Sequence, residues 1–175
     1  DVYKRQLHKW FGSPLGAGLA YVKKERIGEI SPLFGDVDKP ADNIAKLGHF
    51  GTPALPILLS LTEAAKFNAM VTIPVKEARL RYLQNYWTRQ AAAIKGVEIT
   101  TPVQPDQSCA LASFKIEGWE AQDVVTQLDS EFGVFTVIRN LKDQQVVRIT
   151  PNLYNTTSDL DRLLEGIDAI SKRQP

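Results

Sequence analysis

The sequence predicts an α/β protein, in which helices and short strands alternate along one chain. Between residues 52 and 95, apolar side chains recur at helical spacing and predict two consecutive helices. Short apolar runs bounded by glycine or proline predict strands at 19–23, 108–116, 134–138 and 146–150. At 175 residues, the chain is long enough for one ordinary domain or one and a half small ones.

Composition excludes several classes of function. The net charge of +1 gives no reason to expect a nucleic-acid partner. No apolar run reaches the ~20 residues that cross a bilayer, so we expect no membrane partner. Cys109 is the single cysteine, which excludes an internal disulfide and a cysteine-based metal site. We therefore expect a protein without a metal, in a reducing compartment such as the cytoplasm.

The pair His8-Lys9 opens a segment that can carry chemistry. Glycines then predict a tight turn before the strand at 19–23, at Gly12, Gly16 and Gly18. An unprotonated lysine amine attacks an aldehyde to form a Schiff base, and partial burial lowers the lysine pKa enough to allow this. On spacing alone, a solvated loop pair is the simpler interpretation of His8-Lys9.

The middle of the chain predicts a long loop followed by two helices. Residues 27–47 show no lasting period and predict a loop. Thr52-Pro53 predicts the N-cap of a helix of about a dozen residues with a buried face. That N-terminus is either a plain cap or also an anion site, because helix N–H groups and the dipole favour negative charge. Pro74 begins the second helix, which Gly96 ends.

The last third predicts a small domain of strands and helices. Residues 97–106 predict a linker, and Cys109 lies in the following strand as a small buried residue rather than a nucleophile. A helix at 119–128, a strand, a polar connection at 139–144 and another strand follow. The final helix, with apolar positions from Leu160 to Ile170, has capping-box candidates at its start: Thr156, Thr157 and Ser158, with Asp159 and Asp161. On composition, Arg148 in the strand at 146–150 is an arginine on an exposed face.

Three ordered segments resemble the class V aminotransferase family, which carries pyridoxal 5′-phosphate (PLP), in its isopenicillin N epimerase-like and cysteine desulfurase-like branch. They are HKWFGSPLGAGLAYVKKERI, HFGTPALP and VVRITPNLYNTTSDLDRLLEGI. The resemblance implies that Lys9 is the catalytic lysine that holds PLP, with His8 beside it. It implies that Gly51 and Thr52 reach the cofactor phosphate, often that of the partner subunit in a homodimer. Arg148 would clamp the α-carboxylate of an amino-acid substrate, since its planar fork matches a carboxylate.

The resemblance also implies an organisation: the C-terminal part of a type I PLP-dependent transferase fold. Residues 7–73 would be the end of the large cofactor domain, 74–95 a connecting helix and 96–175 the small C-terminal αβ domain. The family's upstream half supplies a phosphate loop, a stacking aromatic and an aspartate for the ring nitrogen. Because none of these can be placed in this sequence, we expect the chain to hold PLP poorly and to be an inactive fragment.

Residues 1–6, DVYKRQ, do not look like a natural start. One permitted back-translation, GATGTGTATAAGAGACAG, resembles a transposon end used as a sequencing adaptor. We therefore predict that these six residues are a non-native addition to a truncated gene.

For the complete enzyme, the resemblance favours an aminotransferase, with an epimerase or a lyase as the alternative. A desulfurase that uses a loop thiol is disfavoured, because residues 132–147 contain no cysteine where that family branch keeps one. An alternative of another class is a folded, non-catalytic fragment. The substrate cannot be chosen from the sequence.

Overall fold

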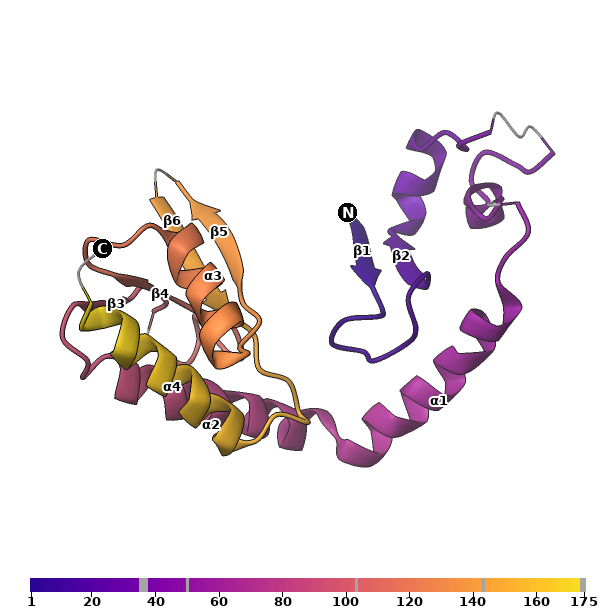
Figure 1. Ribbon diagram of the computed structural model, residues 1–175. Coiled ribbons are helices and arrows are strands. Elements are labelled where there is room, and N and C mark those ends of the chain that lie inside the picture. Colours follow the sequence, from indigo (N-terminus) through magenta and orange to yellow (C-terminus); the bar gives the residue numbers. More distant parts are fainter. Residues whose placement is uncertain (35–37, 50, 103, 143, 174–175) are drawn as a thin grey trace. The chain divides into compact units, whose positions relative to one another are not determined.

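The computed structural model describes residues 1–34, 38–49, 51–102, 104–142 and 144–173. Parts of the predicted loop at 27–47 and of the connection at 139–144 lie outside these ranges. The chain forms two compact units, Asp1–Val71 and Thr72–Pro175 (Figure 1). Each unit is described by itself below. No helix within the described ranges is long and apolar enough to cross a membrane.

The first unit begins with an antiparallel pair of strands. Strand β1 (Val2–Gln6) pairs with β2 (Gly18–Val22) along its whole length. The strand predicted at 19–23 is confirmed as β2, one residue earlier at each end. Strand β1 was not predicted, because residues 1–6 were interpreted as a non-native addition. Its sequence VYKRQ is largely polar, and only the pairing with β2 makes it a strand. Two short 3₁₀ helices follow, Lys24–Glu29 and Ile44–Leu47, within the predicted loop.

Helix α1 (Leu55–Val71) closes the first unit and has 17 residues, where about a dozen were predicted. It differs from its prediction in two further ways. It begins three residues after Thr52, because the Ala54 carbonyl accepts the first helical hydrogen bonds and Pro56 fits the first turn, where no N–H is needed. The predicted buried face is wrong for the described chain: no residue of α1 is buried. Leu59 is 74% exposed and Met70 75% exposed, although the helix is apolar around most of its circumference.

The second unit is built on a four-stranded antiparallel sheet of order β3-β4-β6-β5. Its strands are β3 (Val97–Ile99), β4 (Ala112–Ile116), β5 (Val137–Leu141) and β6 (Gln144–Ile149). Strand β3 lies where the sequence predicted a linker, because three residues with a single apolar alternation are too short a signal. Strand β5 continues into the predicted polar connection, since its residues pair with β6.

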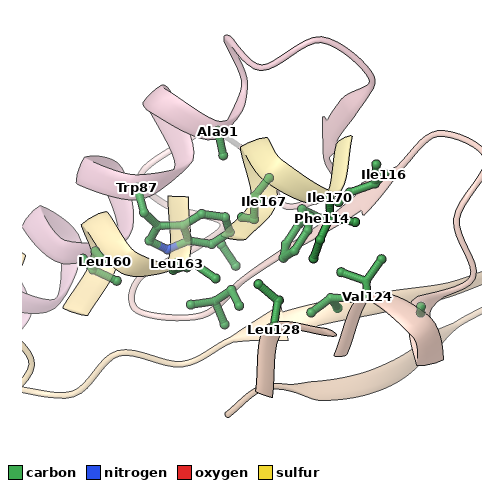
Figure 2. Packing of buried hydrophobic residues seen from close by; sticks show 14 of the residues in the cluster. Trp87, Ala91, Phe114, Ile116, Val124, Leu128, Leu160, Leu163, Ile167 and Ile170 are labelled. Carbon is green, nitrogen blue, oxygen red and sulfur yellow. The ribbon is translucent and has the colours of Figure 1, made fainter. Parts of the chain in front are cut away.

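Helices α2 (Ile73–Ala91), α3 (Ala121–Phe132) and α4 (Thr157–Ser171) pack with one face of this sheet (Figure 1). Their apolar stripes meet the inward side chains of β4 and β6 in one core (Figure 2). At its centre the rings of Trp87 and Phe114 lie edge to face, with centroids 6.0 Å apart. The side chain of Trp87 is fully buried. Burying each such side chain contributes roughly 1.5–3 kcal/mol, so this core holds the unit together.

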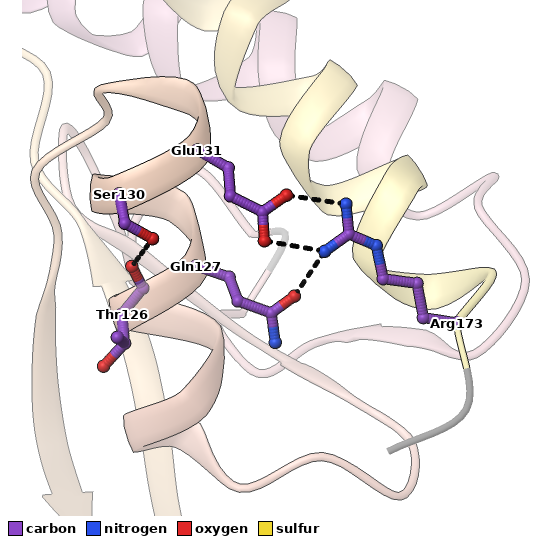
Figure 3. Close-up of polar contacts among 5 residues, drawn as sticks. All are labelled: Thr126, Gln127, Ser130, Glu131 and Arg173. Carbon is purple, nitrogen blue, oxygen red and sulfur yellow. Dashed lines mark hydrogen bonds and ion pairs between the residues drawn. The ribbon is translucent and has the colours of Figure 1, made fainter.

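The predicted capping box of the last helix is confirmed at Thr156. Its hydroxyl accepts a hydrogen bond from the Asp159 N–H, and the Asp159 carboxylate accepts one from the Thr156 N–H. At the other end, Arg173 donates to the Glu131 carboxylate at 2.7 and 2.8 Å and to Gln127, which ties the chain after α4 to α3 (Figure 3). Both ends of α4 are thus fixed by side chains.

Cys109 does not lie in a strand, contrary to the prediction, since β4 begins at Ala112. The backbone around it is bonded to α2 instead: Arg81 donates to the Ser108 carbonyl, and Gln84 donates to the Leu111 carbonyl. Cys109 is half-buried, and burial raises the pKa of its thiol. A raised thiol pKa disfavours the nucleophilic thiolate, in agreement with a structural role.

Candidate active site

Lys9 lies in the connection between β1 and β2. The Leu7 N–H donates to Ala17, the Ser13 N–H donates to Leu7, and the Gly12 N–H donates to the Lys9 carbonyl, each at 3.1 Å. Gly12 has a φ of +80°, which side chains other than glycine rarely adopt. The predicted glycine turn is therefore confirmed, and its own hydrogen bonds fix the backbone of Lys9.

The Lys9 side chain is exposed and His8 is half-buried. Within the described part of the chain, the Lys9 amine has no hydrogen-bond or ion-pair partner. A fixed backbone with an accessible amine is the geometry that a covalent reaction with a carbonyl compound needs.

Helix α1 packs against this turn at two points. The Asn68 side chain donates to the Phe11 carbonyl at 2.8 Å, although the two residues are 57 apart in the sequence. Near the start of the helix, a Cβ added at Gly16 would lie 3.1 Å from Ile57 Cδ1. Glycine at position 16 therefore permits the close approach. Helix α1, which follows Thr52, therefore packs directly against the turn that carries Lys9.

Gly51 and Thr52 are both exposed, ahead of α1. Gly51 has a φ of +76°, so this position favours glycine. Because the Ile57 and Leu58 N–H groups already donate to Ala54 and Pro56 has none, the first turn of α1 offers few free donors. An anion here would rely mainly on the Thr52 hydroxyl and on the backbone before the helix.

His49 is a case in which sequence reasoning missed a contact. Its ring lies edge-on to that of Phe34, with centroids 5.4 Å apart. The two residues are fifteen positions apart in a stretch without periodicity, so no sequence signal pointed to this pair.

Arg148 lies in β6, between the buried residues Val147 and Ile149. It is half-buried, opposite Ser113 of β4 and Val137 of β5. Its Nε is buried and has no hydrogen-bond partner among the described residues. Burial, and then the charge of Arg139, lower the pKa of the guanidinium. A buried donor without a partner is costly, so this position suits an anionic ligand.

The sequence-predicted residues divide between the two units. Lys9, His8, Gly51 and Thr52 belong to Asp1–Val71, where α1 links their segments, and Arg148 belongs to Thr72–Pro175. Sequence reasoning missed Arg139, which it assigned to a polar connection, and Ser113. Both are neighbours of Arg148 only through the register of the sheet. Among the described residues, no cluster of three or more His, Cys, Asp or Glu could hold a metal ion.

Comparison with known proteins decides the family. The family model described as Aminotransferase class-V matches residues 1–163. The chain belongs to the class V aminotransferase family. Among curated relatives, isopenicillin N epimerase of Streptomyces clavuligerus is 26% identical over 98% of this chain and 47% of its own length. A probable cysteine desulfurase of Halalkalibacterium halodurans is 25% identical over 96% of this chain and 45% of its own. The chain thus spans about half the length of these relatives.

Solved structures of the family have the same fold. The cysteine desulfurase CsdA of Escherichia coli matches with a TM-score of 0.79 and 26% identity, over 97% of this chain and 45% of the other. An apo cysteine desulfurase of Thermococcus onnurineus matches with a TM-score of 0.81 and 18% identity, over 98% and 47%. The predicted fold class, α/β and part of a type I fold, is confirmed, as is the branch of the family.

Proposed function

We propose that this chain is part of a PLP-dependent enzyme that acts on an amino acid, with Lys9 holding the cofactor as a Schiff base. Family membership supports the cofactor class, since one structural relative, C-DES, has been solved with glycine covalently linked to PLP. The observation in this chain that carries the proposal is the buried Arg148 Nε without a partner, on a strand in the family's closing segment. It supplies the anion-binding half of an amino-acid site.

The residues present fit the cofactor. Lys9 offers an accessible amine on a fixed turn, and Gly51 and Thr52 offer a hydroxyl and backbone where a phosphate can approach. When bound, PLP supplies an aldehyde for the amine and a ring that withdraws electrons from the substrate Cα. The Lys9 amine, when it is not bonded to the cofactor, would be the general base that takes the proton from that Cα. His8 flanks this position.

Arg148 would orient the substrate. A guanidinium holds a carboxylate through two parallel N–H···O bonds, which fixes the plane of the carboxylate and the direction of the Cα–H bond. The bond at Nε would satisfy the donor that is now buried and unpaired. Lysine at this position would keep the charge but lose the paired geometry.

The reaction is assigned to transamination as the first candidate. Epimerisation is the second, favoured by a specific observation: two curated relatives, from Amycolatopsis lactamdurans and Streptomyces clavuligerus, are isopenicillin N epimerases. Elimination, the lyase alternative, shares the early steps. Incubating the complete enzyme with an L-amino acid separates the three: a keto acid that forms only with a second keto acid present, the D-enantiomer, or free ammonia.

In the complete enzyme we propose a homodimer, in which the Gly51-Thr52 segment of one subunit reaches the cofactor of the other. The exposed apolar surface of α1 supports further protein contacts there, because a helix that is apolar all round is normally buried. We also propose that residues 7–73, 74–95 and 96–175 are the three parts of the natural segment. Sequencing the source DNA upstream of the Leu7 codon checks whether DVYKRQ is native: a reading frame that continues without these codons would show that it is not.

The cofactor proposal is tested by trapping. The 175-residue chain is incubated with PLP and reduced with borohydride, whose hydride adds to the imine carbon, and labelled lysines are mapped by mass spectrometry. Preferential labelling of Lys9, at PLP concentrations that leave Lys66 and Lys95 unlabelled, supports the proposal. A K9A variant, expected to lose only that label, is the matched control. Labelling of all exposed lysines alike would refute selective binding by this chain and leave the folded, non-catalytic fragment.

A further inference from the structure

The sheet face that carries Arg148 also carries a second arginine. The core cluster contains Val147 and Ile149 of β6 but neither Val146 nor Arg148. Because side chains alternate along a strand, Arg148 lies on the face turned away from the helices of the second unit. On β5, Val137 pairs with Arg148 and Arg139 pairs with Val146, so Arg139 lies on this same face.

Arg139 and Arg148 are diagonal neighbours across the β5–β6 ladder. Diagonal positions in an antiparallel pair are about 7–8 Å apart, within reach of long side chains. The two charges act on each other, since Arg139 is the second cause, after burial, of the lowered pKa of Arg148. Two guanidiniums facing one region repel each other unless an anion lies between or beside them.

Neither arginine is neutralised by the rest of the described chain. Arg139 donates to the neighbouring Ile138 carbonyl at 2.7 Å and has no carboxylate partner among the described residues. The other cation of this face differs: Lys115 contacts Glu98 at 3.1 Å and donates to Gln144 at 2.7 Å. Of the three cations on this face, Lys115 has a carboxylate partner. Arg139 and Arg148 have none among the described residues, so both can bind an anionic ligand.

A further polar atom nearby lacks a partner. The Thr100 Oγ1 is buried without a hydrogen bond among the described residues, and the Thr100 N–H donates to the Ser113 carbonyl at 2.9 Å. Ser113 is the β4 partner of Arg148. Thr100 and Arg148 thus lie on opposite sides of Ser113, one strand away from it in each direction, and each has a buried polar atom without a partner among the described residues. Buried polar atoms of this kind call for a partner, which a bound ligand can supply.

We propose that this face binds an amino acid with two carboxylates, such as an α-amino dicarboxylic acid. The inference rests on the proposed function, in which Arg148 holds the α-carboxylate, and adds that Arg139 holds the carboxylate of the substrate side chain. Arg139 would act as a specificity-determining residue. Because it is exposed, solvent screens part of its charge, and we expect about a tenfold preference over the matching neutral amide.

The test compares L-glutamate with L-glutamine, which differ in one charge at nearly equal shape. Each is titrated into the ¹⁵N-labelled 175-residue chain at constant ionic strength, and the arginine Nε–H resonances are followed by NMR. R148K and R139K variants assign the two resonances. We expect both to shift with glutamate, and only that of Arg148 to shift with glutamine, which binds about tenfold more weakly.

Three variants separate this inference from the proposed function. R139Q should reduce glutamate affinity to that of glutamine and leave glutamine unchanged, whereas R148Q should weaken both ligands. R89Q, which removes an exposed arginine from the last turn of α2, is the matched control and should change neither.

The alternative outcomes are distinct. Equal affinity for the two ligands, with both dependent on Arg148, would overturn the dicarboxylate inference and keep the proposed carboxylate role. A glutamate preference that survives R139Q would also overturn the inference. If no resonance shifts saturably with either ligand, or if R148Q changes nothing, both proposals fail for this chain.

Discussion

Replacing Gly166 of α4 by alanine tests how closely α4 packs on α3. A Cβ added at Gly166 would lie 2.6 Å from Leu128 Cδ2 and 3.1 and 3.2 Å from two ring atoms of Phe132. Leu128 is fully buried, so its side chain has little room to move away. The glycine is therefore required by its neighbours and not by its own backbone.

Two opposing effects set the magnitude. Alanine is about 1 kcal/mol more favourable than glycine inside a helix. Overpacking a well-filled core costs typically ~1–3 kcal/mol. Because the shortest contact, 2.6 Å, is much shorter than a normal contact of a Cβ atom, we take the upper part of that cost. G166A should then destabilise the second unit by about 1–2 kcal/mol.

The assay is urea unfolding followed by tryptophan fluorescence in a W10F background. Trp10 is the single tryptophan of the first unit, so the remaining signals, from Trp87 and Trp119, report on the second unit alone. The free energy of unfolding comes from linear extrapolation to zero urea. An unchanged slope of this free energy against urea would show that G166A does not alter the surface exposed on unfolding. E165A, at the exposed neighbouring position, should stay within ±0.5 kcal/mol or so.

A second background makes the test specific. L128A removes the closest contact, so adding G166A to it should cost at least about 1 kcal/mol less than in the parent chain. If G166A instead stabilises the parent by the full helix-propensity difference, or has equal effects in both backgrounds, the packing argument is refuted.

Three further predictions concern single positions. Thr72 has a φ of 66° and a ψ of 150°, a backbone conformation nearly restricted to glycine. T72G should therefore stabilise the chain by about 1–2 kcal/mol. Calorimetry would detect this as a raised Tm, and a lowered Tm would contradict it. T156A removes the side-chain acceptor for the Asp159 N–H and should cost ~1 kcal/mol in urea unfolding, with T156S restoring most of it. The hydrogen bond from Arg173 lowers the pKa of Glu131, so this carboxylate stabilises the folded state above its ordinary pKa and stops doing so as the pH falls through the lowered value. E131Q should therefore lower the urea midpoint at neutral pH and approach the parent as the pH falls below the lowered pKa of Glu131, and a difference that does not shrink in acid would contradict the ion pair.

Local signals in the sequence predicted where α2 and α4 begin. The capping box from Thr156 to Asp159 spans four residues, and Pro74 lies in the first turn of α2. The strands β1 and β3 could not be predicted in the same way, because their residues carry little apolar alternation. They exist as strands because β2 and β4 pair with them, and pairing is a property of the fold rather than of the segment.

Residues of the candidate site also differ in whether a local sequence motif or the pairing of strands identifies them. The segments of Lys9, Gly51-Thr52 and Arg148 were identified by resemblance, since each is a short ordered motif. Arg139 was missed because its relation to Arg148 depends on the register between β5 and β6. Before that register is known, a polar hairpin with an arginine looks like any solvated connection.

The two units differ in how completely they bury their own apolar side chains, and this decides which of the proposed residue roles can be tested first. All residues of the core cluster lie between Leu83 and Ile170, in the second unit. In the described part of the first unit, only Ala17 and Ile27 are buried hydrophobic residues, while Leu59 and Met70 of α1 are exposed. A unit with a buried core of its own is held together by that core, whereas a unit with few buried apolar side chains is not. Carboxylate binding by Arg148, which lies in the second unit, should therefore be measured first.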